Sequence, residues 1–327
     1  MAPVMKHDEL IHSVHYQEVD PGRRWIKDLD VAIDSNGPLD AGHTLTPNVV
    51  RTAGGYRIYY NAIGPERPRP ETTGYILSAF STDAKTWQKE EGVRMDAGGE
   101  GTGNCIWGPD VIPLADGSYR MYFEGRIQGS DGPVKSVIGS ARSPDGIDWR
   151  QEPGIRLEAD DTSYGAPRCL YIAPDSGAGD GRYRLYASDF TDHCIVSAVS
   201  DDGLLFELEP GVRVAREKVL EGYEVYAPEV LRLGDGSYRM YYAGWVAAPE
   251  VPAGSQYHGR VFSAVSADGL QWLKDPDICI DNGGKWDRAK ASEPCVIDLP
   301  DGRFRMFYEA CDYEGRWRIA TATSEQP

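Results

Sequence analysis

Hydrophobic and polar residues alternate along most of this chain, and the alternating segments recur as five copies of one unit. Alternation with a period of two predicts β-strands that bury one face. Each copy opens with a proline, passes through a turn into a second strand, and ends its third strand in a serine. The copies follow one another at intervals of about 60 residues. Their opening prolines are Pro47, Pro109, Pro167, Pro228 and Pro294.

The fifth copy is split between the two ends of the sequence. It stops at Ser324, where the other four copies continue to an aromatic residue and a further strand. The segment 25–34 matches residues 272–281 nearly position for position, and Trp25 precedes the first opening proline by the interval at which Trp272 precedes the last. We therefore predict that residues 25–34 are the outer strand of the fifth copy. A repeat completed from the opposite end describes a closed ring, which leaves few exposed sheet edges.

Units of this length with four short strands are typical of propeller blades. The sequence therefore predicts an all-β fold: a five-bladed β-propeller with four-stranded blades, closed by the N-terminal strand that completes blade five. The length of 327 residues alone would suggest two domains, but one ring needs all five copies. We predict a single propeller domain over residues 21–327 and a polar N-terminal leader over residues 1–20.

Charge and cysteine content limit the partners and the compartment. A net charge of −17 disfavours nucleic acid and anionic membranes as partners. No apolar run is long enough for a transmembrane helix, and the first residues lack the apolar core of a secretion signal. The six cysteines show no zinc-type spacing, so we expect no protein-bound metal site and no cofactor; the sequence leaves open a cation on the axis and a disulfide. These features favour a cytoplasmic protein; they leave the oligomeric state open.

Strand direction separates a structural rim from a functional rim. The turns from first to second and from third to fourth strand share one rim, where Ser143 and Asp145 are expected to cap their turn by hydrogen-bonding its backbone. The long loops 64–74, 128–135 and 246–259 share the other. Long irregular loops on a rigid scaffold commonly carry functional sites, so we predict the site at the second rim.

Charged residues flank the opening prolines at the crowded inner ends of the first strands. Because side chains alternate, the residues before and after each proline are expected to point the same way. Buried charges are unfavourable unless they are paired or used in chemistry. One hypothesis is a structural ring in which Arg168 pairs with the carboxylates; the other is a catalytic site with Asp110, Glu229 and Glu293 in one pocket. In the second, Glu293 would be the base, Glu229 the acid, and Arg168 would hold one carboxyl ionised.

Further polar and aromatic side chains are predicted around these acids, at strand ends and in loops. Aromatic faces beside carboxylates are a common way to bind a sugar or another polar ring compound, so we expect a small-molecule substrate. The predicted substrate-binding residues are Asn48, Trp107, Glu124, Arg168, Asp189, Tyr226, Trp245 and Glu309.

The repeat, the Trp-Gly-Pro-Asp step that ends at Asp110 and the Ser-X-Asp-Gly-X-X-Trp turns resemble the propeller glycosidases. These comprise the arabinanase and xylosidase group (glycoside hydrolase family 43) and the invertase and levansucrase group, and the resemblance covers essentially the whole chain. It implies three catalytic acids, of which Asp110 matches the one after the blade-two proline. The chain departs from the pattern at Thr46, where the resemblance implies a base, and at Tyr226, where it implies a glutamic acid.

The leading functional hypothesis is carboxylate acid/base chemistry in an axial cleft, as glycoside hydrolysis or transfer. An alternative is a non-hydrolytic acid/base enzyme, namely a cyclase, isomerase or lyase of specialised metabolism, which needs only one acid and one base. A second alternative is a catalytically silent sugar-binding propeller. Activity on aryl glycosides would favour the first hypothesis, and an unhydrolysed bound sugar would favour the last.

Overall fold

The computed structural model describes residues 15–99, 102–128, 134–172, 181–218, 221–247 and 257–325. This part of the chain is all-β, as predicted, and contains no α-helix. Accordingly, none of its segments forms a helix that is long and apolar enough to cross a membrane. Residues 1–14 of the predicted leader lie outside the described residues, whereas residues 15–20 include a short strand, β1 (Tyr16–Gln17).

The strands pair in antiparallel groups that follow the sequence copies. The first group is β3 (His43–Thr52), β4 (Gly55–Ile63), β5 (Tyr75–Ser81), β6 (Gln88–Lys89) and β7 (Met95–Asp96). The second is β8 (Ile106–Pro113), β9 (Tyr119–Gln128), β10 (Val134–Ser143) and β11 (Arg150–Gln151). The third is β12 (Tyr164–Ile172), β13 (Arg182–Asp189), β14 (Cys194–Ser200) and β15 (Glu207–Leu208). The next is β16 (Glu224–Leu233), β17 (Tyr238–Ala247), β18 (Tyr257–Ser266) and β19 (Leu273–Lys274). The last is β20 (Lys290–Asp298), β21 (Phe304–Cys311), β22 (Trp317–Ser324) and β2 (Trp25–Ile33).

The pairing of β2 with β22 confirms that the two ends of the chain share one group. Trp25 lies opposite Ser324, as the sequence match predicts. The segment before β2 also follows the repeat. The Tyr241 hydroxyl donates a hydrogen bond to Gly22 O (2.6 Å), just as the Tyr59 hydroxyl donates one to Gly146 O (2.7 Å) in the turn of another group. The N-terminal segment therefore supplies both the outer strand and the turn before it.

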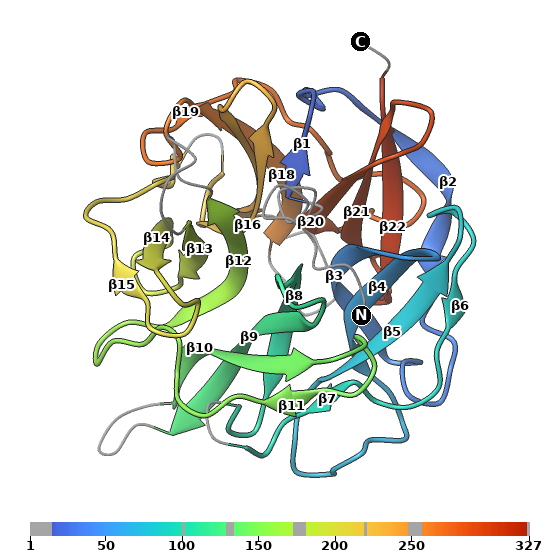
Figure 1. Cartoon of the computed structure of the whole chain (residues 1–327). Helices are drawn as coiled ribbons and strands as arrows, with labels where there is room; N and C mark the ends of the chain where they lie inside the picture. The colour runs from blue at the N-terminus through green and yellow to red at the C-terminus, as the bar shows by residue number, and fades with distance from the viewer. Residues whose placement is uncertain are drawn as a thin grey trace.

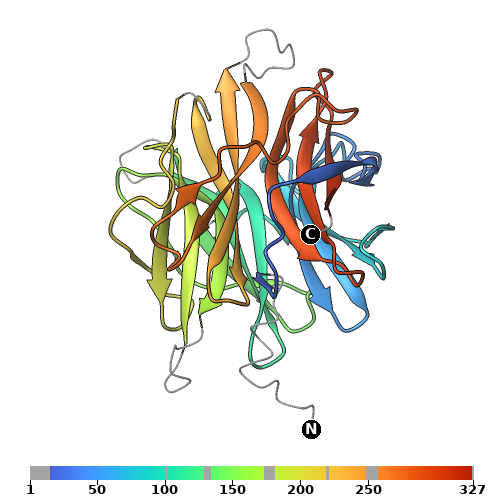
Figure 2. The same cartoon turned by 90° about the horizontal axis from the view of Figure 1, so that it is seen from above.

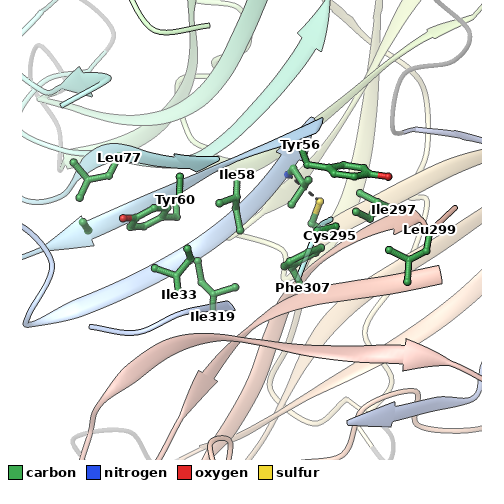
Figure 3. Packing of buried hydrophobic residues seen from close by; sticks show 14 of the residues in the cluster. Ile33, Tyr56, Ile58, Tyr60, Leu77, Cys295, Ile297, Leu299, Phe307 and Ile319 are labelled. Carbon is green, nitrogen blue, oxygen red and sulfur yellow. Dashed lines mark hydrogen bonds between the residues drawn. The ribbon is translucent and has the colours of Figure 1, made fainter. Parts of the chain in front are cut away.

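The first strands of the groups surround a central axis. β3, β8, β12, β16 and β20 contact one another in cyclic order, and Figure 1 shows the groups radiating from that centre. The hydrogen-bonded sheets themselves do not close, since the second and third groups are separate four-stranded sheets. Side-chain packing joins neighbouring groups instead. Figure 3 shows Ile33 of β2, Ile58 of β4 and Phe307 of β21 in one buried cluster.

The serine-containing turns have the structural role predicted for them. Asp145 Oδ1 accepts the backbone N–H groups of Ile147 (2.8 Å) and Asp148 (2.9 Å), and Ser143 Oγ accepts that of Gly146 (2.8 Å). These backbone hydrogen bonds hold the pKa of Asp145 below its ordinary value. The turn carboxylates are therefore caps rather than candidates for catalysis.

Candidate active site

The residue before each opening proline has a left-handed backbone. The φ values are 49° at Thr46, 57° at Gly108, 45° at Ala166, 51° at Ala227 and 49° at Glu293. Every one of these strands also changes register there, as a β-bulge does. Left-handed φ is unfavourable for residues other than glycine and is typical of functional sites that the surrounding fold stabilises.

Side chains of the neighbouring group support this backbone. Glu309 Oε1 accepts a hydrogen bond from Thr46 N–H (2.9 Å), and Asn61 Oδ1 accepts one from Gly108 N–H (2.8 Å). Glu309 and Asn61 occupy equivalent positions in the second strands of their groups, β21 and β4. The corresponding residue beside Glu293 is Ala243, which has no acceptor to offer. Polar residues at this position of the second strands thus stabilise the bulge by hydrogen bonds, and they also lie beside the central axis.

The bulge corrects the prediction that residues before and after the proline point the same way. It breaks the alternation, so Glu293, before its proline, lines a large cavity. Asp110 and Glu229, after their prolines, are 0% exposed and lie outside that lining. Asn48 is likewise fully buried, and it hydrogen-bonds to Asp110 (3.2 Å). The three predicted catalytic acids therefore do not converge in one pocket.

The cavity has a volume of about 660 Å³, within the usual range for small-molecule sites. It lies at the rim that carries the long loops, as predicted from strand direction. Its lining residues come from all five groups: Leu45, Thr46, Trp107, Gly108, Glu124, Arg126, Val134, Lys135, Ser136, Ser163, Ala166, Phe190, His193, Tyr223, Glu224, Tyr226, Trp245, Glu293 and Glu309.

Two glutamates that line the cavity, Glu293 and Glu309, have raised pKa values. Burial, reinforced by the charges of Glu309 and Glu124, raises the pKa of Glu293 well above its ordinary value. Burial also raises the pKa of Glu309 to about 7, although hydrogen bonds from Thr46 N–H and the Ser292 hydroxyl (3.1 Å) oppose the shift. Carboxyls that repel one another in a buried site cannot all ionise near neutral pH.

Two further glutamates stand on the cavity walls. Burial raises the pKa of Glu124, against the opposing effects of Arg126 and of a hydrogen bond from the Ser136 hydroxyl (2.8 Å). Burial also raises the pKa of Glu224, whose Oε1 lies 3.5 Å from His193 Nδ1. The cavity thus brings together four glutamates that all hold protons more tightly than exposed carboxyls do.

An aromatic wall faces these acids. The Trp245 indole N–H donates to the Tyr226 hydroxyl (2.7 Å), and the two rings meet edge to face at 5.3 Å. His193 and Tyr223 pack at 4.9 Å between ring centroids. Amphipathic aromatic residues offer apolar faces to a ring compound while their polar atoms hold a fixed orientation.

A buried network of charges lies beneath the cavity. Arg168 Nη1 is 2.7 Å from Asp110 Oδ1, and Arg168 Nε is 2.7 Å from Glu229 Oε2. Burial alone would raise the pKa of Asp110, but Arg168 and His15 hold it below its ordinary value. Burial raises the pKa of Glu229 despite Arg168. This arrangement matches the structural-ring hypothesis for Arg168.

The remaining predicted residues divide between the cavity and other places. Trp107, Glu124, Tyr226, Trp245 and Glu309 line the cavity with Glu293. Arg168 instead borders a narrow void of about 20 Å³ under it, which Glu293 also lines. Asp189 caps the turn after β13, because its Oδ1 accepts the N–H groups of Thr191 (2.9 Å) and Asp192 (3.0 Å). Asp189 does not line the cavity, and its role as a substrate-binding residue stays a prediction.

Sequence reasoning missed Glu224, His193 and Phe190 in the cavity lining. Glu224 begins β16 four residues before Pro228, outside the positions that the repeat singles out. His193 has a φ of 55° in the tight turn between β13 and β14, which no residue pattern marks. Within the described residues, no group of three or more His, Cys, Asp or Glu side chains is placed to hold a metal ion.

No family model matches this chain. A stretch of 174 residues is 30% identical to uncharacterized protein Rv1502 of Mycobacterium tuberculosis and covers 52% of this chain and 53% of that protein. The chain thus matches about half the length of this curated relative.

Solved structures share the fold over nearly the whole chain. A complex of BT0996 with RGII superimposes with a TM-score of 0.68 at 17% identity, covering 92% of this chain and 93% of the other protein. A thermostable family-43 glycoside hydrolase gives 0.63 at 17% identity, over 88% and 91%. A structure of the GH130 family of mannoside phosphorylases and glycoside hydrolases gives 0.69 at 13%, over 93% and 96%. The chain therefore has a glycosidase-like propeller fold, as its sequence pattern predicts.

Proposed function

We propose that this protein is an enzyme that acts on a sugar-like small molecule by carboxylate acid/base chemistry in the cavity, as a glycoside hydrolase or transferase. The observation that carries the proposal is the convergence of four glutamates of raised pKa beside an aromatic wall in a cavity of about 660 Å³. The fold shared with glycoside hydrolase structures supports the same reading.

The two glutamates at the base of the cavity suit complementary roles. Glu293, whose pKa burial and the charges of Glu309 and Glu124 raise well above its ordinary value, is the proposed general acid. Glu309, with a pKa of about 7, is the proposed base or charge-stabilising carboxylate. A pair of carboxyls, at least one of raised pKa, is the usual equipment for glycoside chemistry. This proposal replaces Glu229 as the acid and changes the role of Glu293 from the predicted base to the acid.

We also infer that the strand groups are the blades of a five-bladed propeller. The cyclic contacts of β3, β8, β12, β16 and β20 support this count, as does the completion of the last group by β2. In such a ring the five bulged strand starts meet at one end of the axis, which accounts for the position of the cavity.

A non-hydrolytic acid/base reaction is the second candidate. It is favoured by the environment of Glu309, whose two oxygens already accept hydrogen bonds from Thr46 N–H and the Ser292 hydroxyl. A carboxylate held in this way suits a base or an electrostatic role better than covalent attack on a sugar. Release of an aryl alcohol from aryl glycosides would support hydrolysis, and conversion of a sugar without water uptake would support the second candidate.

The pH dependence follows from the two perturbed acids. We expect kcat/KM to fall as the pH drops through about 7, because Glu309 gains a proton and can no longer act as a base. We expect a second fall at higher pH, where Glu293 loses the proton that it must donate. A bell-shaped profile measured on an aryl glycoside panel checks this; a flat profile from pH 5 to 9 would contradict both roles.

Replacing the proposed acid tests the site directly. Glu293→Gln is expected to lower turnover about 100-fold or more, the usual contribution of a general acid. The thermal midpoint is expected to stay or to rise, since a buried carboxyl repelled by Glu309 and Glu124 is removed. Glu207→Gln, an exposed change on β15, is the matched control and should leave turnover unchanged. Full activity of the Glu293 variant would place proton transfer elsewhere.

A further inference from the structure

The segment just before β2 crosses the end of the axis opposite the cavity. Its strand β1 pairs in parallel with the last residues of β16, with Tyr16 opposite Arg232. Tyr226, near the start of β16, lines the cavity, so the two sites lie at opposite ends of one strand. Figure 2 shows the groups from the side, with the blue N-terminal part reaching the lower end of the strands. We call residues 15–22 the axial strap.

Specific contacts fasten the strap at both of its ends. Arg232 N–H donates to His15 O (2.7 Å). Asp20 Oδ2 accepts a hydrogen bond from Arg239 Nη2 (2.6 Å), and Gly22 O accepts one from the Tyr241 hydroxyl. The strap is therefore built into the fold, and its backbone fixes where the His15 side chain points.

The imidazole of His15 reaches the buried charge network. It is 2% exposed, and its Nε2 lies 3.2 Å from Asp110 Oδ1, the oxygen that also receives Arg168. Two carboxylates and one guanidinium leave one excess negative charge, which burial makes unfavourable. Burial favours the neutral form of Asp110, but Arg168 and His15 together hold its pKa below the ordinary value. His15 also acts to lower the pKa of Glu229, but burial has the larger effect there and raises it.

We propose that His15 is a positioning residue, whose imidazole the axial strap delivers to Asp110 so that Asp110 stays ionised and Arg168 stays shared between Asp110 and Glu229. An opposite charge or a polar hydrogen close to a carboxyl favours the charged form of that carboxyl, and His15 Nε2 lies 3.2 Å from Asp110 Oδ1. Arg168 and Glu293 line the same narrow void, so the network also forms the base of the cavity. The importance of the network for the cavity rests on the proposed function, whereas the contact of His15 with Asp110 does not.

Denaturant unfolding of the full chain tests the proposal without any substrate. His15→Leu removes the polar contact, whereas His15→Gln keeps a side-chain N–H at a similar reach. At pH 7 we expect the leucine variant to raise the unfolding equilibrium constant about 10- to 100-fold, the usual range for loss of a polar partner of a buried charged group. The glutamine variant should recover most of this loss. Tyr16→Phe, which removes only the hydroxyl that contacts Glu18, is the strap control and should match the wild type.

The pH dependence separates positioning from simple space filling. The titratable groups around Asp110 are His15 from the strap, Arg168 and Cys169 from β12, Glu229 from β16, and Cys295 from β20. A carboxyl of lowered folded-state pKa stabilises the protein above its unfolded pKa, near 4, and loses that effect as the pH falls. The difference between wild type and the leucine variant should therefore shrink below about pH 4.

Two results would overturn the proposal. One is an equal and pH-independent loss of stability in His15→Leu and His15→Gln, which would show that the imidazole ring of His15 only fills space. The other is strict additivity of His15→Leu and Asp110→Asn, because residues in contact are expected to couple. Either result concerns folding alone, so it is distinct from a failure to find turnover in the cavity.

Discussion

Deletion of residues 1–34 is expected to abolish cooperative folding. The deletion removes β2, and with it the partner of β22 and the ring of Trp25, which packs edge to face on Tyr241 at 5.6 Å. It also removes Ile33, which is 2% exposed in the cluster of Figure 3. Loss of a fully buried side chain of this kind costs about 1.5–3 kcal/mol, and a domain has only about 5–15 kcal/mol in total.

The same deletion leaves charges without partners on the remaining strands. Asp28 Oδ2 lies 3.3 Å from Arg305 Nη2 and accepts a hydrogen bond from the Thr321 hydroxyl (2.7 Å), while Asp34 pairs with Arg318 (2.9 Å). A truncation of residues 1–14 spares all of these contacts and is the matched control. We expect the shorter truncation to be soluble with a sharp thermal transition and the longer one to aggregate. A cooperatively folded chain without residues 1–34 would disprove the closure.

The fold could be predicted from the sequence because its signal is repeated and local. Alternation marks each strand, the opening proline marks each copy, and the match of 25–34 to 272–281 identifies the split copy. Pairings such as Trp25 with Ser324 then follow from aligning the copies. The pattern of one strand is a weak indication by itself. Five copies that align with one another indicate the same fold five times.

The candidate site could be predicted only in part, because side-chain direction depends on backbone geometry that the repeat conceals. Strand alternation would place Asp110 and Glu293 on one side, but the bulge and the left-handed φ before each proline separate them. Cavity residues on irregular turns, such as His193, follow no period. The contact of His15 with Asp110 joins positions far apart in the sequence, and no residue pattern marks it.

The hypothesis of a structural ring and that of a catalytic site concern different residues of the inner strands. The residues after the prolines form the paired network around Arg168, whereas Glu293, before its proline, opens to the cavity. Each bulge therefore divides one strand into a buried half and a half that faces the cavity. A propeller built in this way can change its cavity residues without disturbing the charges that hold the inner strands together.

Arg168→Met is expected to destabilise the protein by about 3–5 kcal/mol at pH 7, the usual cost of leaving buried charges without their partner. Asp110 and Glu229 are both 0% exposed, so neither can recover hydration once the guanidinium is gone. Their pKa values should rise in the folded state. A carboxyl of raised folded-state pKa binds its proton more tightly when folded, so the variant should regain stability as the pH falls.

Urea denaturation at several pH values checks this expectation, with Arg303→Met as the control. Arg303 is partly exposed and pairs with the exposed Asp301 (2.7 Å), a surface arrangement that contributes about 0–1 kcal/mol. Adding Asp110→Asn and Glu229→Gln to Arg168→Met should restore much of the lost stability, because the stranded charges disappear with the carboxylates. A loss below about 1 kcal/mol, or no recovery in the triple variant, would show that the axial charges do not depend on Arg168.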